Sequence, residues 1–454
     1  MNILLINAPL EKRETYKSFS PPLGILYLAA VLEKNGFEVE IIDGDQENNC
    51  FEAINLKISN NKPDIVGISA MTPTFLNAVL TAQQIKQLNP DSLLVLGGYH
   101  PTFNAERILK KYSFIDICVR GEGEYSFLEI AKGIPLRNIA GITYREGDLI
   151  RTNPTRPSIA DLDELPFPAR HLIKKYDYKY SESFNWNDPR RYRLSELKRY
   201  TSIATSRGCP FKCLFCANTA FSSNKFRGRS AENVAAEIEQ VVKDGSNRFF
   251  FVDDNFTANP TRAIKICKYI KDLNANIKWF CMGRADTASD ELYLEMAKSG
   301  CILILFGVES GSQRILDYYN KNTKVAQIKN ALKLARKYRI DIFASLIVGA
   351  PIESDADIEE TKKLVVGEDI DFLEVSKLAI NSGTPLWKKA VSENKINEEK
   401  DWEKLLFVYD VFKEISALNI RKWARKINHA FYLRPDYLAK QIWRTFNAHK
   451  NIIN

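Results

Sequence analysis

Three cysteines on one short stretch are the residues of this chain best suited to metal chemistry. Cys209, Cys213 and Cys216 follow the apolar run 203–205 and are separated by three and then two residues. A zinc site normally has four protein ligands, but the nearest histidine, His171, lies far upstream in the sequence. A [4Fe–4S] cluster usually takes four cysteines, so three leave one iron open for a substrate or cofactor. The alternative is that the three thiols are ordinary buried apolar groups.

The string from Cys209 to Cys216 resembles the CxxxCxφC signature of the radical S-adenosylmethionine (SAM) enzymes, in which φ is often aromatic and here is Phe215. The resemblance implies that Cys209, Cys213 and Cys216 hold a [4Fe–4S] cluster whose open iron chelates SAM. It also implies an electron donor, such as flavodoxin or ferredoxin, whose electron cleaves SAM to a 5′-deoxyadenosyl radical. The protein would then supply orientation and exclusion of water, while the cofactors supply the chemistry.

Polar and small residues follow the later predicted strands at positions where members of this family contact SAM. Taken singly, each has an ordinary structural explanation, such as a helix cap for a carboxylate, an ion pair for an arginine or a turn for a glycine. The resemblance assigns the SAM amino group to Asp253, Asp254 and Asn255, the carboxylate to Arg284, the ribose to Glu309 and the adenine to the backbone at Gly349, with Phe215 as a further SAM contact.

Small residues also follow three predicted strands in the first part of the chain, where a flat, bulky ligand could approach the backbone. The residues at these strand ends, among them Gly97–Gly98 and Gly121–Glu122, resemble those of the cobalamin-binding domain fused ahead of many radical SAM enzymes. The stretch 7–10 lacks the Asp-x-His-x-x-Gly motif by which mutases ligate cobalt, so a cobalamin-free member of the family remains an alternative. His100 could approach the corrin, but a turn histidine satisfied by backbone is the favoured interpretation. The resemblance implies cobalamin contacts at Ser69, Thr72, Gly97, Gly98, His100, Gly121 and Glu122.

The first part of the sequence predicts the strands and helices that would position the residues assigned to cobalamin. Apolar, β-branched runs predict buried parallel strands, and the segments between them have helical spacing. Five such units in succession predict a doubly wound, Rossmann-like α/β domain over residues 1–137, with its ligand crevice at the carboxyl ends of the strands. The expected strands are 3–6, 39–42, 65–68, 93–96 and 115–119, and the expected helices are 23–35, 50–58, 75–88, 104–112 and 124–132.

Residues 138–199 interrupt this alternation with a hairpin signal around Gly147 and a proline-containing linker. Strand and helix signals then resume, and six further units predict a partial (β/α)6 radical SAM barrel over residues 200–386, whose site lies at the carboxyl ends of its strands. Residues 387–454 are expected to form a helical carboxyl-terminal region. The expected barrel strands are 200–205, 248–252, 278–282, 302–307, 341–347 and 372–378.

Composition excludes several other classes of protein. Of the 454 residues, 45% are hydrophobic and 26% charged, as in ordinary globular proteins. Eight cysteines in a chain of this size argue against a disulfide scaffold. No apolar run approaches the ~20 residues of a membrane span, and we expect a cytoplasmic protein. A net charge of +8 does not call for a nucleic-acid partner. The basic, aromatic tract 421–450 could lie on a membrane surface, but packing against the domain is favoured.

The resemblance favours cobalamin-dependent methyl transfer to an unactivated carbon of a small molecule or lipid. One alternative is a radical cyclase or other carbon-skeleton rearrangement with the same cofactors. Another is a cobalamin- or SAM-binding sensor without turnover, which is disfavoured because sensing needs no three-thiol loop. The aromatic and basic residues of the linker 167–200 and of the tail after Pro385 suggest a partly apolar acceptor.

Overall fold

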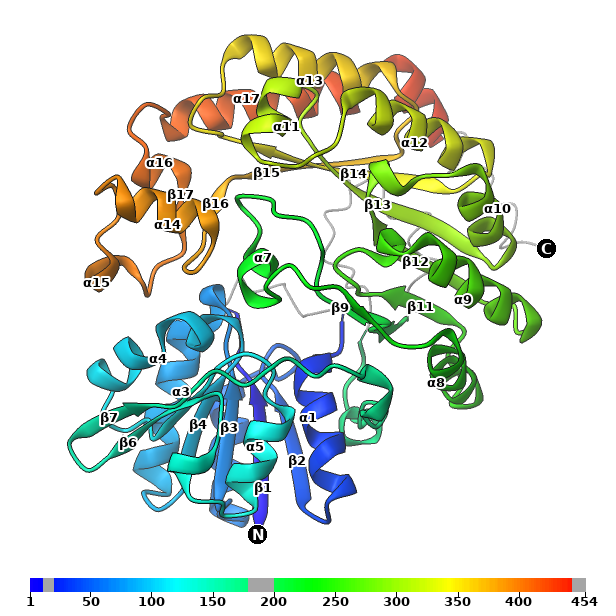
Figure 1. Cartoon of the computed structure of the whole chain (residues 1–454). Helices are drawn as coiled ribbons and strands as arrows, with labels where there is room; N and C mark the ends of the chain where they lie inside the picture. The colour runs from blue at the N-terminus through cyan, green and yellow to red at the C-terminus, as the bar shows by residue number, and fades with distance from the viewer. Residues whose placement is uncertain (11–19, 179–199, 443–454) are drawn as a thin grey trace. The chain divides into compact units, whose positions relative to one another are not determined.

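The computed structural model describes residues 1–10, 20–178 and 200–442. The chain forms two compact units (Figure 1). The first unit comprises residues 1–178 together with 381–383 and 396–405, and the second comprises 179–380, 384–395 and 406–454. Residues 179–199 of the predicted linker and 443–454 of the tail, both considered above as possible acceptor contacts, lie outside the described residues.

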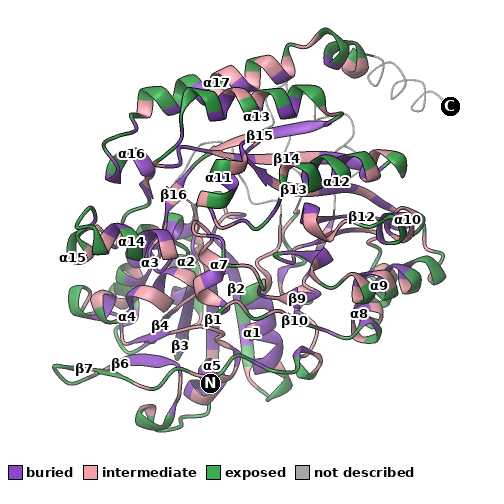
Figure 2. Ribbon diagram, turned by 45° about the horizontal axis from the view of Figure 1, so that its top comes forward, coloured by how far each residue is buried: buried purple, intermediate pink, exposed green. Residues whose placement is uncertain are grey.

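The first unit contains a seven-stranded sheet in the order β2-β1-β3-β4-β5-β6-β7, of which the first five are parallel. This is the doubly wound arrangement that the sequence predicts. The apolar runs form buried strands (Figure 2) because helices cover them, with α1 contacting α5 and α2 contacting α3. The elements are β1 (Asn2–Asn7), α1 (Leu23–Lys34), β2 (Glu38–Asp43), α2 (Cys50–Asn60), β3 (Ile65–Ser69), α3 (Phe75–Leu88), β4 (Leu93–Gly97), α4 (Tyr99–Lys111), β5 (Ile117–Val119) and α5 (Glu124–Ala131).

The hairpin predicted within residues 138–199 extends this same sheet. Strands β6 (Ile142–Glu146) and β7 (Leu149–Thr152) pair with each other, and β6 pairs antiparallel with β5. The hairpin therefore belongs structurally to the first unit, because its backbone continues the hydrogen-bond ladder beyond β5.

The second unit contains a six-stranded parallel sheet in the order β15-β14-β13-β12-β11-β8. Neighbouring strands succeed one another in the chain, and among the described residues β8 and β15 each pair on one side only, so the sheet is open. The predicted α/β class is confirmed, with a doubly wound domain followed by a six-stranded parallel sheet. The strands are β8 (Thr201–Ile203), β11 (Arg248–Phe251), β12 (Lys278–Gly283), β13 (Cys301–Glu309), β14 (Asp341–Val348) and β15 (Phe372–Lys377).

The helices of the second unit lie between these strands and after them. Helix α17 contacts α13 and β15, and its buried Trp423 and Phe431 lie on one face, as an amphipathic helix packed on a domain requires. No helix of the described chain is long and apolar enough to cross a bilayer. The helices are α7 (Ala217–Phe221), α8 (Ala231–Lys243), α9 (Pro260–Asp272), α10 (Asp290–Lys298), α11 (Gln313–Tyr318), α12 (Val325–Lys337), α13 (Asp355–Gly367), α14 (Pro385–Ser392), α16 (Val408–Val411) and α17 (Ala417–Tyr432).

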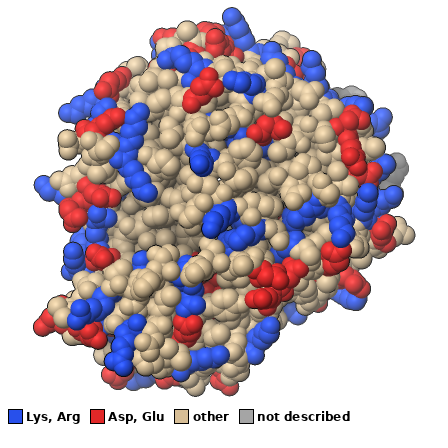
Figure 3. All heavy atoms as spheres, viewed as in Figure 1, with Lys and Arg blue, Asp and Glu red and all other residues tan. Residues whose placement is uncertain are grey.

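Short strands and one short helix connect these larger elements in the described part of the chain. Strands β9 (Ser206–Arg207) and β10 (Arg227–Gly228) pair with each other on either side of the cysteine loop, and β16 (Ala379–Ile380) pairs with β17 (Leu406–Phe407). Helix α15 (Glu398–Asp401) belongs to the first unit although it follows the second sheet in the chain. Lysine and arginine side chains lie interspersed with acidic ones on the face shown in Figure 3, which fits the modest net charge.

Candidate functional site

The three cysteines lie on the loop between β9 and α7 in the second unit. Cys213 is buried, while Cys209 and Cys216 are half-buried. Burial raises the pKa of Cys209 to about 11, and the neighbouring Cys216 raises the pKa of both other thiols further. The three thiols are therefore within electrostatic reach of one another, and a metal centre binding there must displace protons from them.

The described residues contain no ready-made site for a single metal ion. Within residues 1–10, 20–178 and 200–442, no three His, Cys, Asp or Glu side chains are grouped so as to hold one metal ion. In a [4Fe–4S] cluster each cysteine binds a different iron, so thiols spaced along a loop fit it. Phe215, half-buried on the same loop, packs edge-on against Tyr319 with 5.1 Å between ring centroids.

Two predicted SAM contacts hold the start of the cysteine loop. Asp253 is buried, and its carboxylate accepts hydrogen bonds from the backbone N–H of Thr205 (2.6 Å) and from the hydroxyls of Thr205 and Ser206. Asp254 accepts from the N–H of Gly208 at 3.1 Å. Both carboxylates therefore anchor the connection from β8 into the loop, a role that their position after β11 did not reveal.

Asn255 differs from these two aspartates because part of its side chain is free. It is buried, and its Oδ1 accepts from the Thr257 hydroxyl at 2.9 Å. Its Nδ2 is also buried and has no hydrogen-bond partner among the described residues. A buried amide donor without a partner is unfavourable by itself, so it marks a place where a ligand oxygen would fit.

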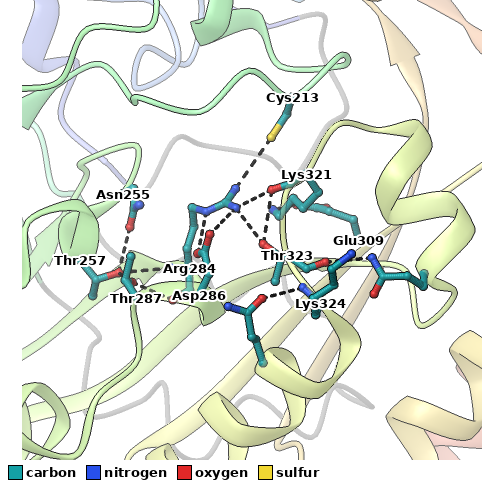
Figure 4. A network of polar contacts seen from close by, with 12 residues as sticks. Cys213, Asn255, Thr257, Arg284, Asp286, Thr287, Glu309, Lys321, Thr323 and Lys324 are labelled. Atoms are coloured by element: carbon teal, nitrogen blue, oxygen red, sulfur yellow. Dashed lines mark hydrogen bonds and ion pairs between the residues drawn. The ribbon is translucent and has the colours of Figure 1, made fainter.

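Arg284 is the centre of a polar network at the end of β12 (Figure 4). Its Nε and Nη2 donate to the two carboxylate oxygens of Asp286 at 2.9 and 2.8 Å. Its Nη2 also donates to the Lys321 carbonyl at 2.6 Å and to the Thr323 hydroxyl at 2.8 Å, and Nη1 lies 3.8 Å from the Cys213 sulfur. The predicted carboxylate contact of SAM is thus engaged within the chain and lies against Cys213, a predicted cluster ligand.

Glu309, the predicted ribose contact, lies in a buried ion pair that the sequence did not predict. Its carboxylate lies 2.6 Å from Lys321 Nζ, and each side chain is 8% exposed. Glu309 has a φ of +63° at a register shift of β13, and such strained backbone persists only where the surroundings fix it. A Cβ on Gly307 would overlap the Glu309 carboxylate and lie 2.9 Å from Lys321 Nζ, so a side chain there would displace this pair.

Gly349 is the residue predicted to let adenine approach the backbone, and its nearest neighbours are apolar side chains from the carboxyl-terminal part of the chain. Its φ is +109°, and a Cβ there would lie 2.8 Å from a Val408 methyl and 2.9 Å from an Ile420 methyl. The small residue therefore makes room for the carboxyl-terminal helices. Glu353 accepts hydrogen bonds from the N–H groups of Gly349 (2.5 Å) and Ala350 (3.2 Å), and burial raises its pKa to about 7.

The small residues predicted to contact cobalamin do meet at one edge of the first sheet. Ser69 and Gly97 are register partners at the carboxyl ends of β3 and β4, and both are half-buried. Gly98 has a φ of +99°, and a Cβ there would lie 2.7 Å from the Ala70 carbonyl oxygen. Met71, two residues after Ser69, is 56% exposed. This edge therefore presents bare backbone beside an accessible apolar side chain.

Gly121 and Glu122 lie at the end of β5 and serve internal connections. The N–H of Gly121 donates to the Thr102 hydroxyl at 3.0 Å. The carboxylate of Glu122 accepts from the N–H of Ile159 at 2.8 Å, which fastens the segment after the hairpin to the sheet.

His100 lies inside the core of the first unit. It is fully buried, stacks on Phe75 with 4.1 Å between ring centroids, and lies 5.8 Å from the ring of Trp402. Its Nδ1 is 3.2 Å from the hydroxyl of the predicted cobalamin contact Thr72. The interpretation of His100 as a turn histidine satisfied by backbone is wrong, because the residue lies in α4 and its ring contacts the Thr72 side chain. Its Nε2 is buried and has no hydrogen-bond partner among the described residues, and the cobalamin contact stays a prediction. Burial lowers its pKa to about 3.

Comparison with known proteins matches both parts of the chain. The B12 binding domain model matches residues 13–131, and the radical SAM superfamily model matches residues 203–365. An uncharacterized methyltransferase of Pyrococcus horikoshii is 34% identical over 98% of this chain and 95% of its own length. The anaerobic magnesium-protoporphyrin IX monomethyl ester cyclase of Rubrivivax gelatinosus is 33% identical over 76% of this chain, which spans 61% of that protein.

Among solved structures, the fold is similar to that of the radical SAM methyltransferase TsrM from Kitasatospora setae, a structure with cobalamin and a [4Fe–4S] cluster bound. The TM-score is 0.70 at 16% identity, and the match covers 86% of this chain and 78% of that one.

Proposed function

The chain belongs to the radical SAM enzymes that carry an amino-terminal cobalamin-binding domain, and from this premise we propose that it transfers a methyl group to an unactivated carbon of a small-molecule or lipid acceptor. One observation carries the choice of methyl transfer. The alignment with a relative named as a methyltransferase runs from end to end of both chains, whereas the chain spans only 61% of the cyclase relative.

In this proposal Cys209, Cys213 and Cys216 hold a [4Fe–4S] cluster in the second unit. Bound together, the cluster and SAM supply the one-electron chemistry that opens an unactivated C–H bond. Asp253 and Asp254 hold the loop that carries the three thiols. An external one-electron donor, such as flavodoxin or ferredoxin, would be required because neither SAM nor the cysteine ligands can supply the electron that reduces the cluster.

The structure changes which residues are proposed to touch SAM. Asn255 offers a buried amide donor that lacks a partner within the described chain, so we assign it to an acceptor oxygen of SAM. Phe215 offers an aromatic face beside the thiols. Arg284 and Glu309 are held by Asp286 and Lys321, so they shape the site through these ion pairs.

Cobalamin is assigned to the carboxyl edge of the first sheet, where Ser69, Gly97 and Gly98 expose backbone and Met71 exposes an apolar side chain. A large flat ring needs such an open surface. His100 packs between Phe75 and Trp402 with its Nε2 unpartnered among the described residues, so this proposal leaves it as a candidate cobalamin contact and not as an assigned cobalt ligand.

The deciding experiment incubates the anaerobically reconstituted protein with methyl-labelled SAM, cobalamin, a reductant and an extract that contains candidate acceptors. Methyl transfer predicts a labelled product together with S-adenosylhomocysteine and 5′-deoxyadenosine. A radical cyclase predicts 5′-deoxyadenosine without label in a product. A sensor predicts binding of the cofactors without either nucleoside product, and either of these two outcomes would contradict methyl transfer. The matched control omits the reductant.

A further inference from the structure

We propose that Arg284 is a positioning residue for the cluster, whose guanidinium donates an N–H to the Cys213 sulfur and thereby raises the potential at which the cluster accepts an electron. This inference rests on the proposed function, since it requires the cluster on Cys209, Cys213 and Cys216. It concerns an arginine that the family resemblance assigned to a different partner, the carboxylate of SAM.

The first argument is that the guanidinium cannot turn away from the thiol. Asp286 accepts from both Nε and Nη2, and Nη2 also contacts the Lys321 carbonyl and the Thr323 hydroxyl. A planar guanidinium held on these two nitrogens has a fixed orientation. Nη1 is the nitrogen left over, and it points at the Cys213 sulfur (Figure 4), 3.8 Å away.

The second argument is that the cysteine loop itself covers this contact. Phe211, two residues before Cys213, stacks on the guanidinium with 3.5 Å between its ring centroid and the guanidinium carbon. Arg284 is 7% exposed. A hydrogen bond shielded from water in this way is electrostatically stronger than one at the surface.

The third argument concerns the charges that face Cys213. Arg284 is paired with Asp286 and Lys321 is paired with Glu309, so each of the two cations is balanced by a carboxylate. The contribution that distinguishes Arg284 is therefore the directed N–H, not a net positive charge. Because a reduced cluster carries one more negative charge, a donor to a ligand sulfur stabilises the reduced form more than the oxidised form.

The test is an anaerobic redox titration of the loaded protein, followed by electron paramagnetic resonance of the reduced cluster. In Arg284→Lys the charge remains but the planar fork is lost, so we expect about a tenfold lower ratio of reduced to oxidised cluster at a fixed potential, which is a midpoint lower by about 59 mV. The matched control is Arg229→Lys, which alters another buried arginine–carboxylate pair of the second unit, with Glu237. Its midpoint should equal that of the native protein.

A second measurement does not depend on the variant folding. The native protein is produced with arginine labelled with ¹⁵N in the guanidinium group, and pulsed magnetic resonance of its reduced cluster is searched for a ¹⁵N coupling. We expect a coupling that Arg229→Lys retains. An unchanged midpoint in cluster-loaded Arg284→Lys, or no ¹⁵N coupling in the native protein, would overturn the proposal for Arg284 alone. Failure of the native protein to assemble a cluster would instead overturn the proposed function.

Discussion

The two sheets end in different kinds of residue. At the carboxyl ends of the second sheet, charged side chains are bound to each other, as Arg284 is to Asp286 and Glu309 is to Lys321. At the same ends of β3 and β4 in the first sheet stand Ser69, Gly97 and Gly98, all half-buried, and burial lowers the pKa of the nearby His100 to about 3.

This difference follows from what each unit is proposed to hold. A cluster that changes charge requires fixed dipoles and ion pairs whose orientation does not change during the reaction. A large ring that binds through its face requires room and backbone groups instead. We therefore expect that removing a functional group from a side chain impairs the second unit. In the first unit, we expect that adding atoms to a glycine is what impairs it.

The largest effect is expected from Cys213→Ala. Removing one of three thiols should abolish the cluster and with it all cleavage of SAM, because an iron would lose its only protein ligand. Iron and sulfide content and formation of 5′-deoxyadenosine measure this. The matched variant is Cys267→Ala, which removes a buried thiol of the same unit outside the loop and should retain both. A full cluster in Cys213→Ala would remove the basis of the proposed metal site.

The next largest effect is expected from Gly98→Ala, which adds one carbon to the first unit. The left-handed φ and the overlap with the Ala70 carbonyl should together destabilise β4 and α4 by about 3 kcal/mol. Gly36→Ala has a similar φ of +84° but no atom within 4 Å of its Cβ, so it should cost only about 1 kcal/mol. Hydrogen exchange of the β4 and α4 amides compares the two variants. Equal effects would show that space at this edge is unimportant.

Glu353 should make the second unit less stable as the pH rises. Its pKa is raised from 4.5 to about 7, so the folded chain retains a proton that the unfolded chain has lost. The stabilisation is complete below pH 4.5 and is lost as the pH rises through 7. Urea unfolding of metal-free protein should show about 2.5 kcal/mol less stability at pH 8 than at pH 5 from this group. Glu353→Gln should remove the difference, whereas Glu360→Gln, at an exposed position of α13, should leave it.

His100 should give the first unit the opposite pH dependence, with a somewhat smaller effect. Its pKa is lowered from 6.5 to about 3, so the unfolded chain binds a proton that the folded chain does not. The stabilisation is complete above pH 6.5 and is lost as the pH falls toward 3. Lowering the pH from 7 to 5 should cost about 2 kcal/mol. His100→Phe should reduce this loss and His171→Gln, at an exposed histidine, should not. If both variants behave alike in urea unfolding, the two units do not differ in this way.

The elements of both sheets could be predicted because burial on both faces imposes continuous apolar runs. Strand β14 was expected at 341–347 and occupies Asp341–Val348. Helix α4 was expected to begin at residue 104 but begins at Tyr99, because Pro101 is tolerated in a first helical turn and a kink at Asn104 follows it. The spacing of the three cysteines likewise identified their loop, since local spacing is all that this motif requires.

The partners of the site residues could not be predicted, because they come from distant parts of the chain. Nothing near Arg284 in the sequence indicates that the backbone of Lys321 and the side chain of Cys213 meet it. Lys321 and Glu353 were missed altogether, as neither stands in a motif. Gly349 stays a predicted adenine contact, and the approach of α16 and α17 to it depends on packing that no local pattern contains.

The return of residues 381–383 and 396–405 to the first unit has a consequence for synthesis of the protein. Trp402 belongs to the apolar core of that unit, and Lys111 and Tyr112 bond Glu403. The amino-terminal half therefore leaves the ribosome without a piece of its own core, and most of the second unit must be translated before that piece arrives. Protease resistance of the first unit in stalled nascent chains should rise only after residue 405 has emerged, so maturation of one unit waits for the other.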